Sequence, residues 1–335
     1  MTTKNGTDDA PRLRVDLNAV VLAVTDDQPR VLTVMPEANA STAKRESHTE
    51  LRALPFGPFH LERDRTLERC IRATVTRQTG GRLDYVEQLY TFADKGRDPR
   101  EQTGAVRILS IAYLALVQES VLETADDTSW QDCYGYFPWE DWRGGRPPLI
   151  DEIELALRDW VETLPGKERL AQRERMEICF GLGSVGWDAY QVLERYELLY
   201  EARLIHEYWA DRGQAPRVDI HRRLGRPMAF DHRRMLATGL GRIRGKLRYR
   251  PVAFELLPET FTLLRLQHVV EALSGLQLHK QNFRRFVERS GLVEGTGYRE
   301  ARTGGRPAEL FRFRRAVLRE RRAPGVASLQ PPREP

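Results

Sequence analysis

The spacing of hydrophobic positions divides the chain into a strand-rich front part and a helix-rich back part. Two β-branched runs in Leu13–Glu37 (LRVDLNAVVLAVTDDQPRVLTVMPE), joined at TDDQPR, predict a hairpin. Tyr85–Arg100 predicts a strand that runs into a Gly/Pro turn, and Ile108–Val117 predicts an interior strand. Between these strands, the apolar residues of Thr66–Gly80 recur at helical spacing, which predicts a helix that ends at Gly80.

Helical periodicity dominates the middle of the chain. Prolines and glycines interrupt the sequence at Trp139–Pro148, and the helical pattern then continues to about Asp211. Its clearest segment is Trp187–Asp211, in which Tyr and Leu recur every three or four residues. Such a stripe indicates a buried core face, with a dimer seam as the alternative. A further helix, Asp231–Leu247, has a strongly basic face, and Asp231 is its expected N-cap.

The last 75 residues or so carry the densest pattern. Phe261–Gly275 predicts an amphipathic helix, and Leu278–Glu294 predicts a second helix that closes at Ser290–Gly291. Tyr298–Arg315 predicts a strand, a Thr-Gly-Gly tip and a second strand. Helix, short turn, helix and β-hairpin is the element order of a winged helix-turn-helix.

The net charge of +5 over 335 residues conceals an uneven distribution. Between Asp231 and Arg322 the chain has 21 Lys/Arg against 9 Asp/Glu, whereas residues 1–230 have 31 against 38. An acidic front joined to a basic back is typical of a sensor attached to a nucleic-acid-binding domain. Chance patterning of solvated charges is the alternative.

Other bulk features exclude several classes of protein. The longest apolar run, Ile108–Val117, is about half the length of a membrane span. The N-terminus has no apolar signal core, and the three scattered cysteines form neither a disulfide framework nor a metal cluster. We therefore expect a cytoplasmic protein without a membrane partner.

Leu54–Gly80 resembles a Nudix box, whose pattern is Gly-x5-Glu-x7-Arg-Glu-U-x-Glu-Glu-x-Gly, with U aliphatic. Val75, Gly80 and an LPxG opening at Leu54–Gly57 remain. When the pattern is anchored on Gly80, its acidic positions fall on four residues that are not carboxylates: Arg65, Thr74, Arg77 and Gln78. Helical carboxylates at this spacing would hold a divalent metal that activates water against a pyrophosphate. We therefore expect no metal site and no catalytic residue.

The resemblance to Nudix proteins extends beyond Leu54–Gly80 to other segments of the chain. EQLYTFADKGRDPR and ILSIAYLALV resemble a segment common in Nudix proteins related to ADP-ribose pyrophosphatases. FDHRRMLATGLGRIRGKL, KQNFRRFVE and GGRPAELFRF resemble the Nudix-related transcriptional regulators of NAD metabolism, the NrtR family. The similarity covers Leu13–Phe137 and Phe230–Arg314, whereas Leu149–Pro227 departs from shorter members as a helical insertion. In that family a Nudix-like domain senses ADP-ribose or a related nucleotide, and a winged helix binds operator DNA as a dimer.

These features together predict an α+β fold: a Nudix-like α/β/α sandwich with a helical insertion, followed by a C-terminal winged helix-turn-helix. The predicted divisions are a tail at 1–12, a degenerate Nudix-like sensor at 13–148, the insertion at 149–227, a connecting helix and linker at 228–258, the winged helix at 259–318 and a tail at 319–335.

The second helix of the winged-helix segment predicts the DNA-binding residues. Phe283, Phe286 and Val287 cluster on one side and are expected to anchor the helix. Polar and cationic side chains on the remaining surface suit base edges and phosphates. We expect Gln281, Asn282 and Arg285 to contact bases, and Lys280, Arg284 and Arg289 to contact phosphates. Arg302 and Arg306 flank the glycine tip and are further candidates; a basic solvated helix is the alternative.

A nucleotide site needs an aromatic surface for the base and cations for the diphosphate. Tyr90 and Phe92 are the aromatic candidates, with a core role as the alternative. The candidate cations are Arg52, Arg65, Arg77, Arg97 and Arg100, for which solvated or turn-stabilising roles are the alternative. Arg65 or Arg77 would replace the charge of the lost metal.

The sequence thus predicts a DNA-binding regulator, expected to be a repressor and a homodimer, that binds double-stranded operator DNA. Its effector would be a nucleotide such as ADP-ribose or NAD, with no other cofactor. One alternative is a Nudix hydrolase of ADP-ribose that uses non-standard acids: Glu62, Asp64 or Glu68. Another is a scaffold whose basic C-terminal region binds RNA or acidic proteins.

Overall fold

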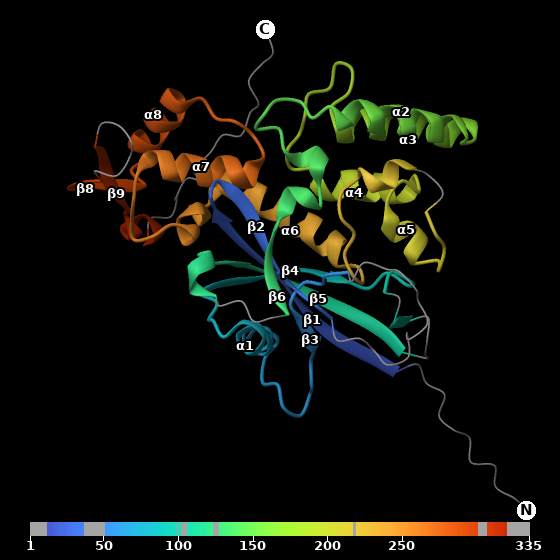
Figure 1. Ribbon diagram of the computed structural model, residues 1–335, viewed down its shortest axis with the longest axis horizontal. Helices are drawn as coiled ribbons and strands as arrows, with labels where there is room; N and C mark the ends of the chain where they lie inside the picture. Colours follow the sequence, from blue (N-terminus) through green and yellow to red (C-terminus); the bar gives the residue numbers. More distant parts are fainter. Residues whose placement is uncertain are drawn as a thin grey trace, which may run out of the picture.

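The N-terminal part of the chain forms a mixed six-stranded sheet, which lies in the lower part of the view in Figure 1. The computed structural model describes residues 12–36, 51–98, 100–101, 106–122, 127–216, 219–300 and 307–319. The strands follow the order β4-β5-β1-β2-β6, and β3 pairs with β1. Their bounds are β1 Arg12–Thr25, β2 Gln28–Val34, β3 Phe56–Pro58, β4 Tyr85–Phe92, β5 Val106–Leu116 and β6 Thr128–Asp132.

The predicted hairpin and interior strand are confirmed. β1 and β2 are antiparallel, and Asp26 and Asp27 turn the chain with φ angles of 50° and 59°. Two successive positive φ angles match the twist of the strands, and Asp tolerates this conformation better than bulkier residues do. β5 lies inside the sheet, parallel to β1 and antiparallel to β4.

Helices cover both faces of the sheet, which confirms the predicted α/β/α sandwich. α1 (Leu67–Thr79) begins where the Thr66 hydroxyl accepts a hydrogen bond from the Arg69 N–H, and it ends at Gly80 with φ of 70°. Alternate residues of β1 face opposite sides: Leu17 packs in the core under α1, and Val20 packs in the core under α6 (His232–Tyr249). This alternation separates two cores across one sheet.

The helical insertion contains α2 (Leu149–Glu162), α3 (Gly166–Phe180), α4 (Val192–Glu201) and α5 (His206–Ala210). The predicted helical segment 187–211 is not one continuous helix, because it contains two separate helices, α4 and α5. Arg203, with φ of 63°, separates α4 from α5, and the Trp209 indole N–H donates to its carbonyl at 2.9 Å. The Tyr/Leu stripe does form core, because Tyr196 is fully buried and Leu204 is nearly so.

The predicted winged helix is also confirmed. α7 (Leu263–Ser274) and α8 (Lys280–Ser290) each end at a glycine with positive φ, 72° at Gly275 and 66° at Gly291. A three-stranded sheet in the order β7-β9-β8 completes the domain. β7 (Thr260–Phe261) precedes α7, and β8 (Val293–Glu300) and β9 (Ala308–Phe313) follow α8. The glycine tip of the wing lies outside the described residues.

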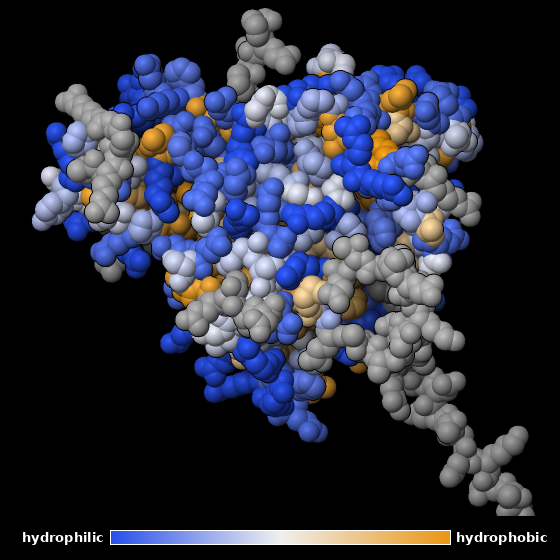
Figure 2. Space-filling view, in the orientation of Figure 1, coloured by the Kyte–Doolittle hydropathy of each residue, from blue (hydrophilic) through white to orange (hydrophobic). Residues whose placement is uncertain are grey.

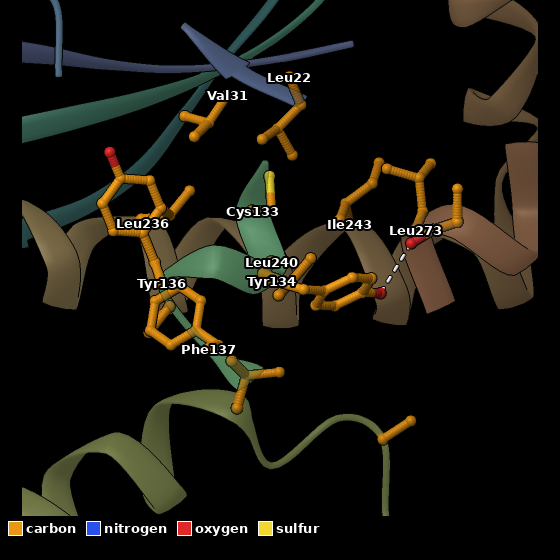
Figure 3. Packing of buried hydrophobic residues seen from close by; sticks show 14 of the residues in the cluster. Leu22, Val31, Cys133, Tyr134, Tyr136, Phe137, Leu236, Leu240, Ile243 and Leu273 are labelled. Atoms are coloured by element: carbon orange, nitrogen blue, oxygen red, sulfur yellow. Dashed lines mark hydrogen bonds between the residues drawn. The ribbon is translucent and has the colours of Figure 1, made fainter. Parts of the chain in front are cut away.

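One continuous hydrophobic core joins the sheet, the insertion and the winged helix. It contains Leu22 of β1, Leu199 of α4, Leu240 of α6, Leu273 of α7 and Phe283 of α8. Figure 3 shows part of this packing, including the hydrogen bond from the Tyr134 hydroxyl to the Ala272 carbonyl at 2.7 Å. The predicted sequence divisions therefore share one buried interior.

A buried ion cluster lies at this junction. Glu140, which is 1% exposed, accepts from Arg195 at 2.5 and 3.0 Å and also from Arg244. Arg244 further donates to the Leu273 and Ala189 carbonyls at 3.1 and 2.9 Å. Burial alone would raise the pKa of Glu140, but the two guanidinium groups outweigh it and lower that pKa.

The helix predicted to have a strongly basic face, α6, buries part of that charge. Arg233 and Arg244 of α6 are fully buried, since Arg233 pairs with Glu207 at 3.1 Å and donates to the Tyr136 carbonyl at 2.6 Å. Asp231 lies at the predicted N-cap position, but its side chain makes no capping hydrogen bond. Within the described residues, no helix is both long and apolar enough to cross a membrane.

The first turn of α6 is tied to the segment before β3. The Leu54 N–H donates to His232 Nδ1 at 2.9 Å, and the imidazole is almost fully buried. Burial, assisted by the nearby Arg100 cation, lowers the pKa of His232 to about 3. Nδ1 must remain unprotonated to accept this bond.

We predict that Glu140→Gln destabilises the fold by about 3–5 kcal/mol, because it leaves two buried guanidinium groups without a counter-charge. Urea unfolding measures this change. The matched control is Glu154→Gln, since Glu154 pairs with the exposed Arg158 at 2.6 Å on the surface of α2. That change should cost about 1 kcal/mol or less. Equal costs in the two variants would contradict a special role for the buried cluster.

We also predict a pH dependence of stability that originates at His232. Because its folded pKa is lowered to about 3, the unfolded state binds the extra proton as pH falls below about 6.5. The free energy of unfolding should then fall by about 1.4 kcal/mol per pH unit from this group alone. His232→Asn keeps an acceptor near the Nδ1 position but cannot titrate. Unfolding measured from pH 7 to 5 should give a shallower slope for the variant, and identical slopes would refute the assignment.

Candidate functional site

The solvent-facing side of α8 carries the predicted DNA-binding residues. Phe283 and Val287 are buried and hold the helix against the core. The residues opposite and beside them are exposed: Lys280, Gln281, Asn282, Arg284, Arg285 and Arg289. Phe286, expected on the anchoring side, is instead 38% exposed, because it lies at the border of the buried stripe. Arg302 and Arg306 lie outside the described residues.

A groove of about 600 Å³ separates α8 from the wing strands and from the first turn of α7. Lys280 and Arg284 line its α8 side, Thr262 its α7 side, and Arg299 and Glu309 its β8–β9 side. Three cations beside a helix N-terminus form a surface that suits anionic oxygens. Figure 2 shows that hydrophilic residues dominate the visible surface of the molecule.

Two of the four positions of the absent box acids, Thr74 and Gln78, are engaged in packing and hydrogen bonding. A Cβ built on Gly57 would lie 3.2 Å from the Thr74 methyl group, so Thr74 fills the space beside β3. The Gln78 side-chain amide donates to the Phe56 carbonyl at 3.2 Å. Arg77 donates to the Thr74 hydroxyl at 3.3 Å, and both Arg77 and Arg65 are exposed. These two arginines lie in or beside α1, away from the other predicted ligand-binding residues.

The alternative acids do not form a cluster. Asp64 accepts from the His60 N–H at 2.9 Å and pairs with Arg63, which lowers its pKa. Glu68 pairs with Arg72 along the exposed side of α1 at 2.8 Å. Among the described residues, no group of three or more His, Cys, Asp or Glu side chains could hold a metal ion.

Five of the predicted ligand-binding residues gather over the sheet face that α6 covers. Tyr90 and Phe92 meet edge to face at 5.1 Å; Tyr90 is exposed, whereas Phe92 is 4% exposed and belongs to the core. The core alternative therefore holds for Phe92 and not for Tyr90. The Arg234 guanidinium lies 5.2 Å from the Phe92 ring centre and links this pair to the loop that follows β4.

That loop places Arg97 in a network of charges. Its guanidinium lies 3.7 Å from the Tyr200 ring centre and pairs with Glu197, which also forms an ion pair with Arg234 at 2.5 Å. Burial raises the pKa of Asp231, the neighbouring acid, to about 7, against the pull of Arg234 and Arg97. Arg97 is therefore half-buried and already neutralised, so it can meet a phosphate only by exchanging partners.

Arg100 belongs to an adjacent aromatic cluster. It donates to Asp16 at 2.7 Å and to Asp98 at 2.5 Å, and it lies 4.3 Å from the centre of the Phe230 ring. The rings of Phe56, Phe230 and His232 lie 5.1–5.3 Å from one another. None of these three aromatic residues is among the predicted ligand-binding residues, although Phe56 lies within the LPxG opening. Distant positions meet here, and only the fold brings them together.

Arg52 lies at the edge of this cluster. Its carbonyl accepts from the Ala229 N–H at 2.9 Å, which joins it to the residue preceding Phe230. Its Nη1 is buried without a hydrogen-bond partner among the described residues. Among the described residues, Arg97 Nη1 is also buried without a hydrogen-bond partner, but it lies 3.8 Å from the Asp231 carboxylate.

Comparison with known proteins identifies the winged helix. Residues 253–313 match the family model of the NrtR DNA-binding winged helix domain. A curated relative, the ADPR responsive transcriptional repressor NtrR of Acinetobacter baylyi, is 37% identical over 108 residues. This match covers 32% of the chain and 40% of the relative, so the chain spans less than half of the relative's length.

Solved structures extend the likeness to the whole fold. The crystal structure of Shewanella oneidensis NrtR matches with a TM-score of 0.52 and 22% identity, and the match covers 89% of this chain and 93% of that one. The same protein complexed with a 27mer DNA matches with a TM-score of 0.51 over the same shares. Residues 253–313 are therefore similar to the NrtR DNA-binding winged helix domain, and the chain as a whole shares the fold of the solved NrtR structures, in which a winged helix follows a Nudix-like sheet domain.

Proposed function

We propose that the protein is a ligand-responsive transcriptional regulator, acting as a repressor, that binds operator DNA through α8 and the wing. The exposed polar and cationic surface of α8, anchored from behind by Phe283 and Val287, carries this proposal. A helix of this kind fits the major groove, where Arg, Asn and Gln side chains read base edges. The groove beside it, with Lys280, Arg284 and Arg299, suits a phosphate backbone.

The effector of this regulator is a nucleotide such as ADP-ribose or NAD, bound over the α6-covered face of the sheet. Tyr90 offers an exposed ring there, and Arg52, Arg97 and Arg100 lie around the same face. The Acinetobacter relative, described as ADPR responsive, supports this choice of ligand. Control of DNA binding requires that the ligand bind one arrangement of the DNA-binding heads more tightly than another.

The sheet domain acts without hydrolysing its ligand. The acidic positions of the box are Arg65, Thr74, Arg77 and Gln78, and Thr74 and Gln78 are engaged in packing and hydrogen bonding. A metal-activated water therefore has no carboxylate support in the usual register. The functional unit is a homodimer whose two winged helices read an inverted repeat, because a two-fold protein fits a two-fold operator.

We predict that replacing Arg284 and Arg285 together by alanine weakens operator binding at least tenfold at physiological salt. Each lost phosphate contact should lower the salt slope of log Kobs by about 0.9. Gel shifts on the DNA upstream of its own gene, over a range of salt concentrations, measure both quantities. Arg158→Ala on the exposed side of α2 is the matched control and should leave them unchanged. Wild-type affinity in the double variant would show that α8 does not read DNA.

We predict that ADP-ribose or NAD changes operator affinity several-fold in the same gel shift, without being consumed. Incubation of the protein with ADP-ribose and Mg²⁺ or Mn²⁺ should give no turnover above background. Turnover that is lost in Glu62→Gln, Asp64→Asn or Glu68→Gln would instead favour a hydrolase. Indifference of operator affinity to all candidate nucleotides would remove the sensing part of the proposal.

A further inference from the structure

Asn18 is a buried amide without partners. It lies on β1, is 0% exposed, and neither its Oδ1 nor its Nδ2 has a hydrogen-bond partner among the described residues. Native proteins satisfy the great majority of buried side-chain polar atoms, and each unsatisfied one weakens the fold. Two unsatisfied atoms on one side chain, one donor and one acceptor, therefore need an explanation.

The surroundings of Asn18 are those of the sensing face. The strand register pairs Asn18 with Phe56 of β3, so both side chains lie on the same side of the sheet. Asp16 precedes Asn18 by two positions on that side and holds Arg100 at 2.7 Å. The Phe56 ring contacts Phe230 and His232, so the amide is next to the aromatic cluster and its cation.

The outer part of this cluster is accessible and held in a strained conformation. Phe56 and Phe230 are half-buried, so their rings reach from the region of Asn18 toward solvent. Phe230 has φ of 57°, a left-handed conformation that is costly for a bulky residue. Such strain persists where the surrounding structure enforces it, and it is concentrated at ligand sites. Here the Ala229 N–H bond to the Arg52 carbonyl fixes the preceding residue at 2.9 Å.

We propose that Asn18 is the residue that recognises the effector, and that the effector enters between Phe56 and Phe230 to reach it. This inference rests on the proposed sensing function and assigns its recognition site. A side-chain amide pairs with a flat edge that carries one donor beside one acceptor. Two parts of the expected nucleotides have such an edge, the adenine ring and a carboxamide. The aromatic rings provide the surface against which this flat group packs.

Binding of four compounds to the full chain, measured by titration calorimetry without DNA, tests the proposal. ADP-ribose contains adenine alone, nicotinamide mononucleotide a carboxamide alone, NAD both, and ribose 5-phosphate neither. We expect Asn18→Leu and Asn18→Asp to weaken binding of the recognised compounds at least tenfold, since one loses both polar functions and the other loses the donor. The arm that is weakened identifies adenine or carboxamide as the recognised edge.

Thr33→Val is the matched control. Thr33 is also fully buried in the sheet, but its hydroxyl donates to the Ser129 carbonyl at 2.9 Å. The Thr33→Val variant should bind all four compounds with affinities within twofold of wild type. Thermal unfolding separates recognition from folding, because Asn18→Leu should raise the melting temperature or leave it unchanged, having removed unsatisfied atoms.

Several results would overturn the assignment. Wild-type affinity in Asn18→Leu would do so, as would equal weakening by Thr33→Val, tight binding of ribose 5-phosphate, or a wild-type chain that binds none of the compounds. A different pattern would remove only the proposed function. If the compounds bind through Asn18 but leave operator affinity unchanged, the site stands and the transcriptional response does not.

Discussion

The Glu140 carboxylate and the two guanidinium groups that meet it are the interaction on which the rest of the molecule depends. Glu140 follows the sheet, Arg195 belongs to the insertion, and Arg244 belongs to the helix that spans the sheet. Transfer of three charged groups into the interior is costly, and only close pairing with further hydrogen bonds offsets that cost. Because each group comes from a different part of the chain, the cluster fixes their relative positions more narrowly than apolar packing alone would.

The same cluster helps to position the winged helix against the rest of the protein. The last carbonyls of a helix lack partners within it, and those of α7 find them in the sheet domain. Arg244 donates to the Leu273 carbonyl, and the Tyr134 hydroxyl donates to the Ala272 carbonyl. The Trp142 N–H donates to the carbonyl of Gly275, the C-cap residue, at 2.7 Å. Since α7 turns at Gly275 into α8, these hydrogen bonds tie α8 to α6 and to the segment 134–142. This contiguous, hydrogen-bonded route is the physical connection through which the proposed effector site would act on the proposed DNA-binding helix.

Much of the architecture is predictable from local sequence. α1, α7 and α8 carry their own signals, such as Thr66 and Thr262 as N-caps and Gly80, Gly275 and Gly291 as C-terminal stops. The exposed surface of α8 follows from helical geometry once Phe283 and Val287 are known to be core. The burial of Arg244 within the basic face of α6 could not be predicted, because its partner Glu140 lies 104 residues away. The burial of Phe92 and the cluster around Phe230 likewise depend on tertiary contacts, which no local pattern encodes.

The continuous core has a consequence for how the molecule comes apart. Leu240, Leu273 and Phe283 share one interior with β1, so the winged helix cannot melt while the sheet remains intact without exposing that interior to water. Unfolding should then be a single cooperative event rather than the sequential loss of separate modules. A winged helix excised near residue 259 would lose the donors, Arg244 and Tyr134, that satisfy the last carbonyls of α7. It would also expose to water the apolar side chains that now pack against the rest of the protein.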